Sequence, residues 1–186
     1  MTPRIMLDYK LETNRIYLRS RIFDDNAFVY EATRYEGFND GMPWNAPLSI
    51  KEMEDRYYLT LENWINAIAY SFVIIEKNTD YRLGIISIRK TEILNKWDIG
   101  YWIHPEKQRM GFMKEAASKI IEFGFLELMA DSIQAKYALW NIASERVLLN
   151  CGMKNVEFIE KGFEKNGEWV KENRMEITKL EWELRK

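Results

Sequence analysis

The feature that most constrains this chain is a change of hydrophobic period at Pro105. Before Pro105, three runs rich in β-branched and aromatic residues are separated only by short turn segments; they span 69–77, 82–90 and 96–104. Short connections between such runs are typical of an antiparallel meander. After Pro105, apolar residues recur about every 3.6 positions, as on one face of a helix. These residues are Met113, Ala116, Ala117, Ile120 and Gly124. We therefore expect an antiparallel sheet followed directly by an amphipathic helix.

The N-terminal third of the chain contains two helix starts. Asp24 and Asp25 carry short carboxylates that suit the first turn of a helix. A second helix is expected to begin at Ser49, because Glu52 follows it in a capping-box arrangement. Apolar residues then recur at helical spacing, so this helix is expected to end near Asn66.

The remaining segments alternate between strand and helix patterns. Strands are expected at 15–20 and 131–139, and a short helix at 141–152. Two closing strands flank Asn166 and Gly167, a dipeptide typical of a two-residue hairpin turn. Together these patterns predict an α+β fold with a mostly antiparallel sheet.

Length and charge narrow the possible functions. The chain has 186 residues, of which 47% are hydrophobic, enough to bury the core of one domain of ordinary size. Because nothing in it has the composition of a linker, residues 1–186 are interpreted as a single domain. The 27 basic and 29 acidic residues are mixed along the chain and give a net charge of −2. Without a basic field, nucleic acid is not an expected partner.

Metal chemistry and membrane insertion are also not expected. Cys151 is the only cysteine and His104 the only histidine, which leaves no ligand cluster for a metal and argues against a Ser-His pair. The N-terminus has no apolar core of signal-peptide length. The longest nearly apolar run, 65–75, is far shorter than the roughly 20 residues that span a bilayer. We therefore expect a cytoplasmic protein that binds no metal.

The turn that follows Pro105 is a candidate anion site. A helix beginning near Arg109 would expose free backbone N–H groups at the positive end of its dipole. Gly111 lets a ligand approach the backbone closely, and Lys107 and Lys114 add positive charge. The alternative is an ordinary helix start with surface lysines.

Two stretches, at 97–116 and 141–152, carry a set of motifs in a fixed order. They are Gly100-Tyr101-Trp102, His104-Pro105, the turn from Gln108 to Met113, Glu115-Ala116, Asn141 with Ser144, and Gly152-Met153. This combination resembles the acetyl-CoA-binding core of the GNAT superfamily of N-acetyltransferases. The branch that it resembles most contains the ribosomal-protein-alanine N-acetyltransferases. A weaker resemblance extends over almost the whole chain.

The resemblance implies a GNAT-like fold whose central sheet is splayed between the fourth and fifth strands, here 96–103 and 132–139, with helices on both faces. The pantetheine arm of acetyl-CoA would lie between these strands as an extra strand does, and the pyrophosphate would lie on the turn. The residues that the resemblance assigns to cofactor binding are Tyr101, Trp102, Ile103, Gln108, Arg109, Met110, Gly111, Phe112, Met113, Asn141 and Ser144.

The resemblance also implies a reaction in which a neutral primary amine attacks the thioester. A backbone N–H group between Gly100 and Ile103 would stabilise the oxyanion. Ser144 is the family-matched group for contact with the sulfur, although serine is also common at helix starts. Tyr137 is a second possible acid, with packing as the alternative. Asp98 stands where the branch often has glutamate and is a candidate base, with a solvent-facing or structural role as the alternative.

The sequence does not single out one acceptor for the acetyl group. Glu36 and Asp40, beside Tyr35 and Trp44, could attract a cationic amine, or the segment could be a solvated loop with aromatic anchors. The predicted function is acetyl transfer from acetyl-CoA to a protein N-terminus, a polyamine or another small amine. The alternative is a non-catalytic CoA-binding or regulatory domain, because Met113 stands where the superfamily usually has glycine or alanine. By resemblance, the protein is expected to be a monomer or a homodimer.

Overall fold

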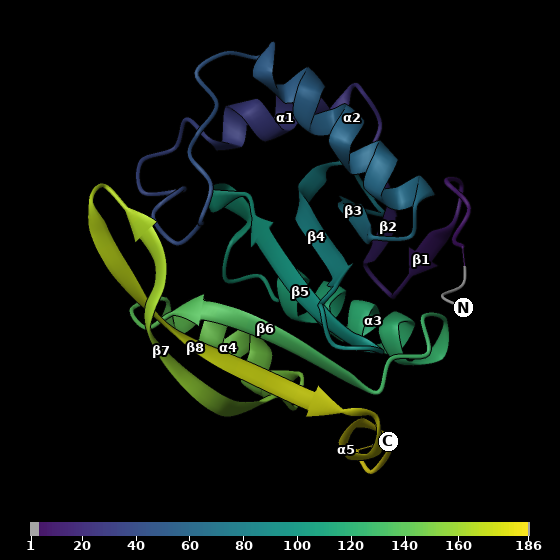
Figure 1. The fold of residues 1–186 in the computed structure, drawn as a ribbon. Helices are drawn as coiled ribbons and strands as arrows, with labels where there is room; N and C mark the ends of the chain where they lie inside the picture. Colours follow the sequence, from purple (N-terminus) through teal and green to yellow (C-terminus); the bar gives the residue numbers. More distant parts are fainter. Residues whose placement is uncertain (1–3, 186) are drawn as a thin grey trace.

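The computed structural model describes residues 4–185, which build an eight-stranded sheet with helices on both faces (Figure 1). The strands are β1 (Lys10–Glu12), β2 (Ile16–Ser20), β3 (Ala69–Glu76), β4 (Arg82–Lys90), β5 (Lys96–Ile103), β6 (Ser132–Ala138), β7 (Lys154–Lys165) and β8 (Glu168–Thr178). Their order across the sheet is β1-β2-β3-β4-β5-β6-β8-β7, and every neighbouring pair is antiparallel except β5 with β6. The predicted α+β fold with a mostly antiparallel sheet is therefore confirmed.

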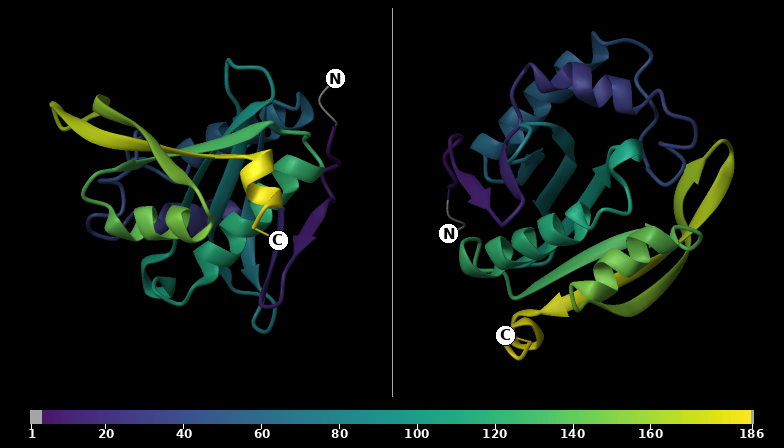
Figure 2. Two further views of the ribbon diagram at one scale, coloured as in Figure 1. Left: turned by 90° about the horizontal axis from the view of Figure 1, so that it is seen from below. Right: turned by 180° about the vertical axis from the view of Figure 1, so that it is seen from behind.

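Helices cover the sheet from two sides. They are α1 (Asp25–Ala32), α2 (Glu52–Ile65), the short 3-10 helix η1 (Pro105–Lys107), α3 (Phe112–Leu126), α4 (Ile142–Asn150) and α5 (Lys179–Glu183). Helices α1 and α2 lie over one face, whereas α3 and α4 lie side by side on the opposite face (Figure 2). The closing hairpin is confirmed, with positive φ angles of 52° at Asn166 and 82° at Gly167, as its tight turn requires.

Two local expectations were wrong, and one strand was not expected. Helix α2 begins at Glu52 and not at Ser49, whose side chain makes no capping hydrogen bond; instead the Glu52 carboxylate accepts the N–H of Leu48. Helix α3 begins at Phe112 and not near Arg109, because η1 and a turn come first. The short strand β1 was not expected, since three residues are too few to show a period. Because β1 is counted in the structure, the strands that the sequence predicted as the fourth and fifth are β5 and β6.

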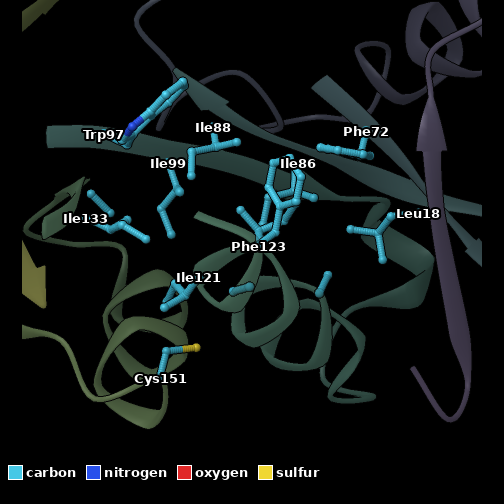
Figure 3. Close-up of a cluster of buried hydrophobic side chains, with 14 of the residues drawn as sticks. Leu18, Phe72, Ile86, Ile88, Trp97, Ile99, Ile121, Phe123, Ile133 and Cys151 are labelled. Carbon is cyan, nitrogen blue, oxygen red and sulfur yellow. The ribbon is translucent and has the colours of Figure 1, made fainter. Parts of the chain in front are cut away.

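The core lies between the sheet and α3 (Figure 3). Phe123 of α3 packs against Phe72 of β3, with ring centroids 5.6 Å apart. Gly124 allows the helix to approach the sheet closely, because a Cβ there would lie 2.6 Å from the side chain of Ile133 and 2.9 Å from that of Ile88. The helical face predicted from the sequence is therefore the buried face of α3.

A buried carboxylate ties α1 to the sheet. Asp25 is fully buried and accepts hydrogen bonds from Arg19 of β2 and Arg82 of β4, and also from the N–H of Ile22. Burial acts to raise the pKa of Asp25, but these hydrogen bonds outweigh it and hold the pKa below its usual value. The helix that carries Phe28 is thus held in a set position over the sheet.

Strands β5 and β6 separate after a short paired segment. Their register runs from Lys96 opposite Ser132 to Ile99 opposite Ala135, and no pair follows. Beyond that point, β5 stays paired with β4 up to Ile103, and β6 stays paired with β8 up to Ala138. Figure 1 shows the two strands diverging from their shared end. The splay predicted between these two segments is confirmed.

The hairpin of β7 and β8 reaches the loop between α1 and α2. The ammonium group of Lys165 donates hydrogen bonds to the carbonyl oxygens of Met42 (3.3 Å) and Trp44 (3.1 Å) and to Oδ1 of Asn45 (3.1 Å). Figure 1 shows this hairpin beside that loop. The two segments meet at the open end of the splay, on the face that α1 and α2 cover.

Candidate active site

The register of the strands assigns side chains near the splay to two faces. On β5, Tyr101 packs against the core on the α3 face, whereas Asp98 and Trp102 point to the opposite face. Phe28 of α1 stacks on Trp102 with ring centroids 5.5 Å apart, which agrees with this assignment. We call the α3 face of the sheet the cofactor face and the opposite face the acceptor face.

The turn from Gln108 to Met113 has the backbone of an anion cradle. Arg109 and Gly111 adopt positive φ angles of 63° and 81°, so glycine suits the second position, where it has no Cβ to strain. Among the described residues, the backbone N–H groups from Arg109 to Lys114 meet no backbone acceptor. They lie at the N-terminal end of α3, where the helix dipole favours an anion.

Met113 does not block this cradle. Only 6% of its surface is exposed, and it belongs to the core cluster together with Phe112 and Ala116. The side chain therefore points into the protein and not toward the turn's exposed N–H groups. Core packing therefore accommodates Met113 at a position where the superfamily usually has a small residue.

An open groove of about 600 Å³ runs beside the turn. It is lined by Thr13, Arg15, Gly111, Lys114, Glu115, Ser118, Lys119 and Glu122. Three of these side chains are cationic, two carry hydroxyl groups and two are acidic; the cationic and hydroxyl groups are the ones that can bind phosphate oxygens. The groove extends from the predicted phosphate turn along α3.

Arg15 is part of this site and escaped the sequence analysis. Its Nη1 donates to the carbonyl oxygen of Met110 (3.0 Å), and its guanidinium lies 4.5 Å from the ring centroid of Phe112. Its Nε pairs with Glu115 at 2.8 Å. No local pattern reveals a contact between residues so far apart in the chain.

Glu115 holds Arg15 and the turn together. Its carboxylate also accepts hydrogen bonds from the hydroxyl of Thr13 and the N–H of Arg15. Burial acts to raise the pKa of Glu115, but the hydrogen bonds from Thr13 and Arg15 outweigh it and lower the pKa. The carboxylate is therefore ionised at neutral pH and keeps Arg15 beside the turn.

Tyr101 and Ser144 meet across the splay. The side chain of Asn141 caps α4 by accepting the N–H of Ser144 (3.1 Å), as the sequence predicted. The hydroxyl of Tyr101 lies 3.0 Å from Oγ of Ser144 and donates to the Ser144 carbonyl oxygen at 3.2 Å. Burial raises the pKa of Tyr101, so its hydroxyl stays protonated at neutral pH. Sequence reasoning named both residues but not their contact.

Tyr137 points away from that pair. Its hydroxyl donates to Glu145 of α4 (2.9 Å) and accepts from Nδ2 of Asn173 on β8 (3.1 Å). Burial is the main cause that raises the pKa of Tyr137, and the hydrogen bond and charge of Glu145 add to the rise. Among the described residues, no hydrogen bond joins Tyr137 to Tyr101 or Ser144.

Asp98 lies on the acceptor face at the closed end of the splay. Only 7% of its surface is exposed. Its Oδ1 pairs with Nη2 of Arg89 at 2.8 Å, and its Oδ2 accepts from Nε2 of Gln134 at 3.2 Å. One carboxylate thus connects β4, β5 and β6 one pair before the end of the β5–β6 pairing.

A family model described as the acetyltransferase (GNAT) domain matches residues 15–154, three quarters of the chain. The chain belongs to the GNAT acetyltransferase family. It is therefore an acetyl-CoA-dependent acyltransferase, and the resemblance read from its motifs is confirmed.

Relatives of this GNAT enzyme cover nearly its whole length. The uncharacterized N-acetyltransferase YnaD of Bacillus subtilis (strain 168) is 29% identical over 172 residues, covering 92% of this chain and 98% of YnaD. A Vibrio cholerae structure assigned as a ribosomal-protein-serine acetyltransferase is 26% identical with a TM-score of 0.81, covering 94% and 99% of the two chains. A Vibrio cholerae spermidine N-acetyltransferase, solved with CoA and spermine, has a TM-score of 0.81 at 18% identity over 91% and 99%.

The acceptor face of the GNAT enzyme carries a second buried carboxylate that sequence reasoning missed. Glu172 of β8 is only 7% exposed and makes no hydrogen bond or ion pair within residues 4–185. Burial is the main cause that raises the pKa of Glu172, with Lys136 opposing and the charge of Asp98 adding to the rise. A glutamate in an alternating strand gives no local signal of burial.

Aromatic side chains close the acceptor face near the end of β5. Phe38 meets Trp102 edge-on at 5.1 Å between ring centroids, and Tyr35 meets His104 at 4.9 Å. The hydroxyl of Tyr35 donates to Glu106 (2.8 Å). Tyr35 and Phe38 thus contact residues at the end of β5, whereas Glu36 and Asp40 are exposed on the same loop.

The described part of the chain contains neither a metal-binding cluster nor a membrane-spanning helix. No group of three or more His, Cys, Asp or Glu side chains there is arranged to hold a metal ion. No helix of residues 4–185 combines the length and the apolar character that crossing a membrane requires.

Proposed function

We propose that this enzyme moves the acetyl group of acetyl-CoA to a primary amine by direct attack on the thioester. The observation that carries the proposal is the opening between β5 and β6, with a phosphate-type turn at one end and the Tyr101–Ser144 pair across it. A thioester held in this opening would have the two hydroxyl groups on one side and the acceptor face on the other.

Acetyl-CoA would bind mainly to backbone groups. Beyond the last β5–β6 pair, the β5 edge from Tyr101 to Ile103 has unpaired N–H and C=O groups toward β6, which can bond the pantetheine arm as a strand would. The turn from Gln108 to Met113 would bind the pyrophosphate through its N–H groups. Arg15 and Lys114 would supply the charge that pairs with the phosphates.

The chemistry then follows from the two faces. The neutral amine attacks the carbonyl carbon, a C–N bond forms, and a backbone N–H of β5 stabilises the oxyanion. When the C–S bond breaks, Ser144 with Tyr101 protonates the leaving thiolate. Tyr137 would position α4 through Glu145, and Asp98 would hold the closed end of the splay while adding negative charge to the acceptor face.

The acceptor is proposed to be a cationic primary amine, either a protein N-terminus or a polyamine. Two buried carboxylates on the acceptor face and the exposed Glu36 and Asp40 would attract such a group. The similarity to the ribosomal-protein-serine and spermidine acetyltransferases supports the same two classes. The cytoplasmic location, the single domain and the monomeric or homodimeric state stay predictions.

Amine-dependent release of the CoA thiol tests this proposal. The enzyme is incubated with acetyl-CoA and either spermidine, a peptide with a free N-terminal serine or alanine, or a simple alkylamine. The same peptide with an acetylated N-terminus is the matched control. We expect thiol release with at least one free amine and none with the blocked peptide, with mass spectrometry locating the acetyl group on that amine. Binding of acetyl-CoA without turnover of any amine would instead favour a non-catalytic CoA-binding domain.

A further inference from the structure

The position of Glu172 relative to the splay is the starting point. On β8, Glu172 is paired with Ala138, at the end of β6 that has already separated from β5. Residues paired across antiparallel strands share a face, and Gln134 shares its face with Asp98. Ala138 lies four residues beyond Gln134, so Glu172 lies on the acceptor face, beside the open part of the splay.

The carboxylate of Glu172 packs closely against the backbone of β7. Gly162 of β7 lies so close that a Cβ there would be 2.4 Å from Oε2 of Glu172. A side chain at this position would displace the carboxylate from where it lies. The chain thus keeps an acidic group buried where an apolar residue would cost less to bury.

The neighbouring carboxylates on this face are paired, and Glu172 is not. Asp98 is held by Arg89 and Gln134, and Glu176 by Lys96. Across from β8, Glu157 pairs with Arg174 and Glu160 with Lys171. The charged groups that act on Glu172 itself are Lys136 and Asp98, and neither forms a direct contact with it. Among these carboxylates, Glu172 is the one with no hydrogen bond or ion pair within residues 4–185.

We propose that Glu172 accepts the proton of the acceptor's ammonium group, directly or through one water, before the amine attacks. This role rests on the proposed function. The ammonium N–H bond breaks, its electron pair stays on nitrogen, and the proton passes to the carboxylate and later to solvent. The second amine proton, lost after the C–N bond forms, balances the proton given to the CoA thiolate.

Two physical conditions favour this role over that of Asp98. Asp98 is paired with Arg89 and hydrogen-bonded by Gln134, whereas Glu172 has no ion pair or hydrogen bond in the described part of the chain that would compete with the incoming ammonium group. A base must also have a pKa near the working pH, and burial moves the pKa of Glu172 in that direction, with Asp98 contributing and Lys136 opposing. The carboxylate of Asp98 is instead occupied by the guanidinium of Arg89.

Glu172→Gln tests the proposal, with Glu160→Gln on the exposed side of β7 as the matched control. The readouts are kcat against pH with the best amine, the affinity for acetyl-CoA, and the unfolding midpoint. Glu172→Gln should lower kcat roughly 100-fold or more, with acetyl-CoA affinity and folding preserved. Wild-type kcat should fall at low pH as Glu172 is protonated, whereas kcat of the variant should keep rising toward the pKa of the amine. Glu160→Gln should behave as wild type.

The other outcomes overturn the assignment. Glu172 would have only a packing or binding role if Glu172→Gln left kcat unchanged, or lowered kcat but kept the wild-type pH profile. The same conclusion would follow if the variant raised only the KM for the amine. If Glu172→Gln does not fold, Glu172→Asp replaces it and should keep the low-pH limb at reduced kcat; loss of that limb would contradict the proposal. A wild-type enzyme that acetylates no amine would refute the proposed function itself, which is a different result from an active wild type with an active variant.

Discussion

The cofactor face and the acceptor face of the splay are built in different ways. The cofactor face uses backbone groups and side chains mainly from two short stretches, the end of β5 with the turn before α3, and the first turn of α4, with Arg15 added from the segment before β2. The acceptor face combines Asp98 of β5, Glu172 of β8, Phe28 of α1 and the loop held by Lys165. A cofactor common to a family can be bound by a short motif, whereas an individual acceptor needs groups from many elements.

The largest effect that would test this division is expected at Gly111. Gly111→Trp should reduce acetyl-CoA affinity by about 100-fold or more, because a side chain there fills the cradle and lies against Arg15. The variant also carries about 1 to 2 kcal/mol of left-handed backbone strain. Calorimetric titration with acetyl-CoA measures the loss, and circular dichroism checks the fold.

Gly167→Trp is the matched control for that strain. Gly167 has a φ of 82° like Gly111, but a Cβ there meets nothing within 4 Å. This variant should lose a similar amount of stability and keep its acetyl-CoA affinity. Equal losses of affinity in both variants would show that strain, and not occupation of the cradle, is responsible.

The next largest effect is expected at the Tyr101–Ser144 pair. Ser144→Ala and Tyr101→Phe should each lower kcat roughly 100-fold with little change in acetyl-CoA affinity, since they act on the leaving thiolate in the transition state. The double variant should lose far less than the product of the two, because the hydroxyls act as one unit. Steady-state kinetics with a fixed amine measures all three.

Tyr137→Phe separates the second tyrosine from that pair. Its hydroxyl bonds Glu145 and Asn173, so the variant should lose about 1 kcal/mol of stability and retain most of its turnover. A loss of kcat as large as that of Tyr101→Phe would make Tyr137 the proton donor.

A smaller effect is expected at Arg15 on the cofactor face. Arg15→Ala should weaken acetyl-CoA binding about tenfold, the value of one charge-assisted hydrogen bond at a partly exposed site. Binding of acetyl-pantetheine, which lacks the pyrophosphate, should not change. If both ligands weaken equally, Arg15 only stabilises the turn through Glu115.

The smallest effect is expected where the hairpin holds the acceptor loop. Lys165→Ala removes the hydrogen bonds to Met42, Trp44 and Asn45. The KM for the amine should rise about threefold, a change below 1 kcal/mol, while the affinity for acetyl-CoA stays constant. A change in acetyl-CoA affinity instead would mean that the two faces are not independent.

Local sequence patterns were sufficient to predict most of the helices and strands and the short motifs of the cofactor face. Alternation in 69–104 and helical spacing after Pro105 predicted the meander and the buried face of α3, because each pattern reflects one repeating backbone geometry. The cap at Asn141 and the turn at Asn166 also follow from the chemistry of adjacent residues. Gly111 and Ser144 were proposed through the family resemblance, whose motifs are also short stretches of sequence.

Contacts between distant segments could not be read in this way. Arg15 reaches the turn before α3 only because β2 and α3 pack together, and Glu172 reaches the splay only through the register of β8 on β6. The burial of Met113 and the partners of Asp98 and Tyr137 likewise depend on packing across elements. A residue type fixes what a side chain can donate or accept, but its surroundings decide its charge and its partners, and those surroundings exist only in the folded chain.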